Sequence, residues 1–153
     1  MPNLFQMKEK ILQTLIRIIE ERISNAKIAM DAAQESANGE GKSSAGDKYE
    51  TSRAMGQIDR DMYARQFHNA SQERTVLDKI DPTTAPISVG LGSLVSTTGG
   101  QYFVAVSIGQ IEVNGKTILA VSPNSPIGLV LKGKKAGDVF LFLGKQQKVI
   151  SIV

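Results

Sequence analysis

The stretch ILQTLIRIIEERISNAKIAMDAAQESANGE, residues 11–40, carries one apolar seam at helical spacing. Apolar positions recur at alternating spacings of four and three, the heptad pattern of a helix that packs along another helix. The seam consists of Leu12, Ile16, Ile19, Ile23, Ala26, Met30, Ala33 and Ala37. Its side chains shrink from isoleucine to alanine, so a partner helix can approach closely at the far end. We therefore predict a long helix over residues 4–38, and four further residues (Ile11, Leu15, Ile18 and Ile28) predict that its base also packs on another element.

The stretch NGEGKSSAGDKYE, residues 38–50, is small and polar and ends this helix. Asn38 and Gly39 tolerate the positive φ of a helix C-terminus. A second helix is predicted to run to about Ile80, where the stretch DPTTAP ends it. Its apolar stripe is predicted at Met55, Ile58, Met62, Tyr63, Asn69 or Ala70, Val76 and Ile80. Because a short connection makes two such helices antiparallel neighbours, residues 1–81 are predicted to form a coiled-coil hairpin with a polar tip at about 38–50.

Residues 82–153 follow a different pattern, with alternating and β-branched runs that predict strands. These runs are SLVST, YFVAVSI, QIEVNGKTILAVS, DVFLFLG and QKVISIV. Asn114 and Gly115 suit a type I′ hairpin turn. Proline and glycine exclude a strand over residues 122–138, where Ile127 to Leu131 are predicted to form a short helix. The fold class is therefore α+β: a helical hairpin followed by a small, mostly antiparallel β domain with one short helix.

Composition excludes several kinds of chemistry. The chain of 153 residues has no cysteine, which removes disulfides and zinc-thiolate sites and fits a cytoplasmic location. Its single histidine, His68, lies in a polar helical run and is interpreted as a solvated residue. No membrane span or signal peptide is expected.

Charge is uneven along the chain. Residues 82–153 carry six lysines against Glu112 and Asp138, so the positive charge of the chain belongs to this half. A basic surface favours nucleic acid or an acidic protein partner. Because no arginine follows Arg74 and no aromatic residues alternate with the lysines, direct base reading is not expected.

Two stretches, VGLGSLV (89–95) and VSPNSPIGLVLKGKKAGDVF (121–140), resemble the C-terminal domain of the Gre family of bacterial transcription elongation factors. Positions that match this family's pattern in order are Ser125, Pro126, Leu131, Gly133, Lys134, Gly137 and Asp138. The order of a helical hairpin before a small β domain is also similar.

This resemblance implies an FKBP-like β domain and an accessory factor that is not itself an enzyme. The implied partner is bacterial RNA polymerase, whose secondary channel would receive the coiled coil, while RNA 3′ ends and DNA are reached only through the polymerase. The resemblance further implies a polymerase-binding surface at Asn124, Ser125, Pro126, Ile127 and Leu131. The uninterrupted heptads and the short connection between the helices predict a monomer with an intramolecular coiled coil.

In the Gre family, acidic residues at the coiled-coil tip help to hold a Mg²⁺ with the polymerase, which then cleaves backtracked RNA. Alignment on the tip tyrosine places Lys42 and Ala45 at the two acidic positions and predicts no cleavage. Alignment on GDKYE instead gives Asp47 and Glu50 the required i, i+3 spacing, which puts them on one helix face as candidate catalytic residues and metal ligands. Stabilisation of the helix N-terminus is the competing interpretation of these two acids. No cofactor of the protein's own is expected, only Mg²⁺ held jointly with the polymerase.

Three functions stay open on sequence alone. The chain is a cleavage-stimulating polymerase factor, a polymerase-binding regulator without cleavage, or a stand-alone helical-hairpin and peptide-binding module. The last would use its hairpin to dimerise, or an aromatic pocket built from Tyr102, Phe103, Phe140 and Phe142 to bind peptides.

Overall fold

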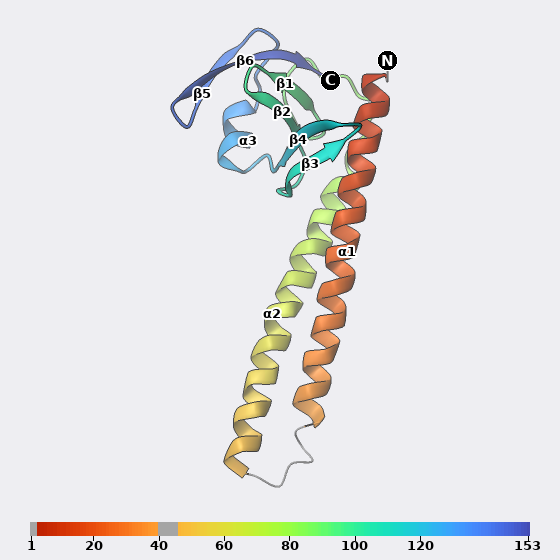
Figure 1. The fold of residues 1–153 in the computed structure, drawn as a ribbon, viewed down its shortest axis with the longest axis vertical. Helices are drawn as coiled ribbons and strands as arrows, with labels where there is room; N and C mark the ends of the chain where they lie inside the picture. The colour runs from red at the N-terminus through yellow and green to blue at the C-terminus, as the bar shows by residue number, and fades with distance from the viewer. Residues whose placement is uncertain (1–2, 40–45) are drawn as a thin grey trace. The chain divides into compact units, whose positions relative to one another are not determined.

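The computed structural model describes the backbone of residues 3–39 and 46–153, and the side chains of residues 3–38 and 50–153. Two long helices come first, α1 (Leu4–Gly39) and α2 (Gly46–Asp78), and strands follow (Figure 1). The chain divides into two compact units. One unit is Arg17–Arg74, called the arm below, and the other joins Met1–Ile16 to Thr75–Val153 and is called the sheet unit. The predicted boundary at residues 81 and 82 marks the change from helices to strands, whereas the units group the helix bases with the sheet.

The arm is an antiparallel pair of helices, as predicted. Glu20, early in the arm, accepts a hydrogen bond from Arg74 at its end, with 3.2 Å between Nε and Oε1. Near the other end, a Cβ added to Gly56 would lie 3.0 Å from the Ala37 Cβ. All eight positions of the predicted α1 seam are buried or half-buried. The alanine end of the seam therefore allows the close approach that the sequence predicted.

The predicted stripe of α2 is wrong in its first half. Met55, Ile58 and Met62 are exposed. The positions that are buried or half-buried instead recur at heptad spacing and are Gly56, Arg60, Tyr63, Phe67, Ala70, Arg74 and Leu77. Because several of these residues are small or polar, the pattern is not evident when only large apolar side chains are considered. The expected widening of the α1 stripe holds for Ile11 and Leu15, which are fully buried, but not for Ile28, which is exposed.

Six strands form one sheet in the described part of the sheet unit, in the order β3-β4-β2-β1-β6-β5. They are β1 (Leu94–Thr97), β2 (Gly100–Val104), β3 (Gly109–Val113), β4 (Lys116–Val121), β5 (Val139–Phe142) and β6 (Lys145–Ile152). All pairings are antiparallel except that of β2 with β4. Asn114 and Gly115 join β3 to β4 with positive φ angles of 54° and 74°, as the predicted type I′ turn requires.

The core of the sheet unit gathers side chains from five strands and from the short helix α3 (Pro126–Leu131), which confirms the predicted helix. Its buried members are Val89, Val95, Tyr102, Val104, Val121, Ile127, Leu131, Phe140 and Val149. Three of the four aromatic residues considered for a peptide pocket, Tyr102, Phe103 and Phe140, are buried core residues. No helix in the described ranges is long and apolar enough to cross a membrane.

The base of α1 is tied to the sheet unit by polar contacts. Lys10 donates from Nζ to Oδ1 of Asn114 at 3.4 Å, and the Asn114 amide lies 3.9 Å from the sulfur of Met7. The β3–β4 turn therefore contacts the first turns of α1.

Candidate functional site

The tip of the arm holds the predicted acidic pair. Glu50 lies in α2 and is exposed. Asp47 lies in the first turn of α2, but its side chain is outside the described part, as are Lys42 and Ala45 altogether. Within the described residues, no group of three or more carboxylate or histidine side chains could hold a metal ion. Asp47 and Glu50 thus stay a prediction as catalytic residues and metal ligands.

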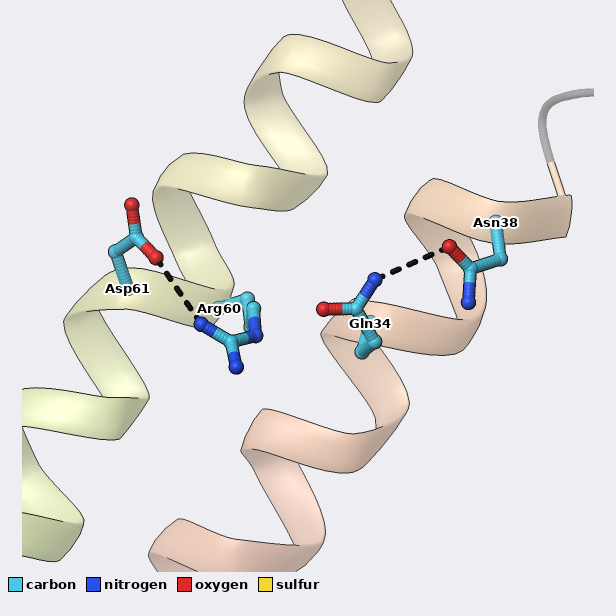
Figure 2. A network of polar contacts seen from close by, with 4 residues as sticks. All are labelled: Gln34, Asn38, Arg60 and Asp61. Atoms are coloured by element: carbon cyan, nitrogen blue, oxygen red, sulfur yellow. Dashed lines mark hydrogen bonds and ion pairs between the residues drawn. The ribbon is translucent and has the colours of Figure 1, made fainter.

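Below the tip, polar contacts form within each helix of the arm (Figure 2). Gln34 donates to Asn38 at 3.1 Å on α1, and Arg60 pairs with its neighbour Asp61 at 3.4 Å on α2. Exposed pairs such as Arg60–Asp61 add little stability. The seam, where Gly56 meets Ala37, therefore contributes more to holding the distal arm than these polar contacts do. His68 is exposed, as predicted.

The segment that carries the family resemblance is locked by its own backbone. Ser125 caps α3: its Oγ accepts a hydrogen bond from the Gly128 N–H at 3.1 Å and donates to the Ser122 carbonyl at 2.6 Å. Pro126 follows in the first turn, where its missing N–H costs nothing. Gly128 packs so closely that a Cβ would lie 2.0 Å from the Ser122 carbonyl oxygen. The turn before α3 therefore has one well-defined conformation.

The residues after α3 also have structural roles. Gly133 and Gly137 adopt positive φ angles of 75° and 94°, which favour glycine. The Asp138 carboxylate accepts a hydrogen bond from the Lys135 N–H at 2.8 Å and closes the turn into β5. The predicted tight turn before VFLFL is confirmed. These motif residues are explained by the local fold alone.

The five predicted binding residues divide into two groups. Asn124 and Pro126 are exposed and Ser125 is half-buried. Ile127 and Leu131, in contrast, are core residues, so a partner docked on α3 cannot reach their side chains directly. The prediction is corrected for these two: they lie four residues apart, and residues at this spacing share one face of a helix, here the face toward the core.

Leu129 was missing from the predicted set. It is 59% exposed, although α3 is otherwise seated in the core. Leu129 lies two residues from each of the buried residues Ile127 and Leu131. On a helix this spacing is about half a turn, so the sequence could have placed Leu129 on the exposed side. The exposed surface of this segment, called the α3 surface below, consists of Asn124, Pro126 and Leu129.

Lys8, at the base of α1, is a second residue that the sequence did not reveal. Its side chain is only 1% exposed, and its ammonium donates to the Thr84 carbonyl at 2.8 Å. Burial lowers the pKa of Lys8, and the nearby Asp81 carboxylate partly offsets this shift. Two hydrogen bonds from Thr83 in turn lower the pKa of Asp81. Lys8 therefore fastens the segment after α2 to the start of α1.

Comparison with known proteins adds a structural likeness only. No family model and no curated protein matches the chain. A solved structure described as that of the transcription factor Gfh1 is similar at 18% sequence identity, over 92% of this chain and 92% of that one, with a TM-score of 0.32. A likeness at this level does not transfer function.

Proposed function

We propose that this chain is a transcription factor that binds bacterial RNA polymerase through its sheet unit and inserts the tip of its arm into the secondary channel. The α3 surface is the observation that carries this proposal. Every motif residue around it has a structural role, but the exposure of Leu129 has none. An exposed leucine on a capped turn and helix offers a partner an apolar contact in a defined position, and such a contact loses little conformational entropy on binding.

The arm suits a narrow, water-filled channel. Its helices are in close contact where Gly56 meets Ala37, toward the tip. A helix of 36 residues such as α1 extends about 54 Å at 1.5 Å per residue. A hairpin of two such helices ends in a few side chains, which fits a narrow passage.

For cleavage, we favour a channel-binding regulator in which stimulation is weak or absent, because alignment on the tip tyrosine removes both acids. If the alternative register holds, Asp47 and Glu50 would supply oxygen ligands on one helix face to a Mg²⁺ that the polymerase already holds. Two carboxylates are too few for a strongly hydrated ion, so the polymerase must provide the other ligands. The metal would polarise the reacting phosphate and its attacking water.

Binding is tested by titrating the full chain with purified bacterial core RNA polymerase. Leu129→Ser should weaken binding at least tenfold and leave the fold intact, because the side chain is already exposed. Leu4→Ser is the matched control, since Leu4 is also exposed, at the start of α1. If Leu129→Ser binds as tightly as the unsubstituted chain, the α3 surface is not the binding site, and if the unsubstituted chain does not bind, the proposed function is wrong.

Cleavage is tested on a backtracked elongation complex with labelled RNA in Mg²⁺ buffer. We expect little shortening of the RNA with this protein present. Robust shortening that disappears in Asp47→Asn/Glu50→Gln, with polymerase binding unchanged, would establish the second register and a cleavage factor.

A further inference from the structure

The β5–β6 hairpin presents an apolar surface that neither the core nor the α3 surface uses. β5 is an edge strand, and Figure 1 shows it paired with β6 at the border of the sheet. Val139 and Leu141 alternate with the buried Phe140, so they lie on the outer face. Ile150 follows the buried Val149 on β6, at a register irregularity of the pairing with β1, and is exposed. These residues and Leu143 at the turn, called the hairpin patch, are all exposed, Leu143 by 85%.

Leu143 is unusual in its backbone as well as its exposure. It has a φ of +51° and precedes Gly144, whose φ is +76°, so the pair has the positive φ angles of a type I′ turn. Asparagine and glycine are favoured at the first of these positions, and a bulky side chain there is strained. The fold therefore does not explain a leucine at this position, which is both strained and exposed.

Two lysines lie on the hairpin itself. Lys148 is exposed and opposes Val139 in the register, so it shares the face of Val139 and Leu141. Lys145 is exposed beside the turn and opposes Phe142, so it belongs to the other face. Neither lysine forms an ion pair with another described residue. The two lysines outnumber the nearest carboxylate in sequence, that of Asp138, so the border of the hairpin patch has a net positive charge.

A groove of about 480 Å³ adjoins the turn. Leu143 and Phe142 line one side, and Tyr102 and Gly99 of the β1–β2 region line the other. Its floor is held in place, because Gln147 accepts hydrogen bonds from both the Tyr102 hydroxyl at 3.2 Å and the Thr97 hydroxyl at 2.9 Å. An apolar side chain of a partner can enter beside Leu143 without rearrangement of the sheet.

We propose that the hairpin patch is a second docking surface for the polymerase, and that it takes an acidic protein segment with aliphatic side chains; this inference rests on the proposed function. The aliphatic residues bind the apolar part of that segment and Leu143 is the central anchor, while the lysines attract its carboxylates. A protein fits better than a nucleic acid, because the patch offers aliphatic side chains, and residues 82–153 contain no arginine for base or phosphate recognition.

Two variants separate the apolar and the electrostatic contributions. Leu143→Asn removes the anchor but suits the positive φ, so it should raise the thermal midpoint while weakening polymerase binding at least tenfold at any salt concentration. Lys145→Gln/Lys148→Gln should weaken binding mainly at low salt and flatten its salt dependence. Leu91→Asn is the control: this exposed leucine precedes β1, at the opposite end of the strand from the β1–β2 turn that borders the groove.

The measurement is the affinity of the full chain for core RNA polymerase at low and high salt, together with thermal unfolding of each variant. Unchanged affinity in Leu143→Asn, with Leu129→Ser still impaired, would overturn the hairpin patch and leave the proposed function intact. No binding by the unsubstituted chain would overturn both. Binding to a DNA duplex that depends on the lysines but not on Leu143 would show that phosphate, not protein, is the ligand of this surface.

Discussion

Lys8 gives the sharpest test of how the base of α1 is held. Lys8→Ala removes a buried four-carbon stem, which should cost about 2–4 kcal/mol by analogy with other large-to-alanine changes. The lost hydrogen bond adds less, because Thr84 is exposed and water can replace the ammonium at its carbonyl. Lys8→Met keeps the stem and removes the desolvated charge, so it should change the free energy of unfolding by less than about 1 kcal/mol. Urea unfolding of the full chain, followed by circular dichroism, measures both variants.

The pH dependence of Lys8 has a defined sign. Burial lowers its folded-state pKa below the ordinary 10.5, so between these two values the unfolded state binds more protons. The free energy of unfolding should therefore rise with pH across that window, and the penalty of the buried charge is fully present below it. The rise should be missing from Lys8→Met. Any pH dependence that remains in this variant comes from the other titratable groups, so it is subtracted as the reference.

The reasoning would be refuted if Lys8→Met cost as much as Lys8→Ala, because the hydrogen bond and not the stem would then dominate. The reasoning would also be refuted if the free energy of unfolding of the unsubstituted chain, relative to that of Lys8→Met, fell as pH rises. The folded protein would then stabilise the charged form of Lys8.

Further predictions concern the two close glycine contacts. Gly56→Ala should gain about 1 kcal/mol of helix propensity and lose about 1–3 kcal/mol to overpacking against Ala37, whose Cβ would lie 3.0 Å away. In an Ala37→Gly background the same change should stabilise the arm, so a double-mutant cycle by thermal unfolding should show coupling, and purely additive effects would contradict the close approach. Gly128→Ala should cost at least about 1–3 kcal/mol, because its Cβ would meet the Ser122 carbonyl oxygen, and should weaken polymerase binding by displacing the α3 surface. Gly90→Ala, with nothing within 4 Å of the added Cβ, is its control, and equal stability of the two variants would mean that the turn before α3 yields freely.

Local periodicity was enough to predict the elements. The α1 seam was evident because its large aliphatic side chains repeat at heptad spacing, and the β3–β4 hairpin because Asn114 and Gly115 suit its positive φ angles. The serine–proline pair before α3 is likewise a local signal, since a cap bonds within its own helix turn. Such features depend on neighbours a few residues away, which the sequence displays directly.

The site depended on contacts that the sequence does not display. Two apolar stripes compete on α2, and the one with larger side chains, Met55, Ile58 and Met62, proved to be exposed. The helix turns its smaller face toward α1 because a glycine opposite Ala37 lets the backbones approach, a choice that depends on volumes from both helices.

The sequence by itself determined the order of the elements and the turns that join them. Only the tertiary structure decided that Ile127 and Leu131 enter the core while Leu129 remains outside, and that Lys8 is buried against a carbonyl 76 residues away. The reason is physical: secondary structure follows from short-range spacing and backbone preferences, whereas burial is set by the chain segments that happen to cover a side chain, and these come from distant parts of the sequence.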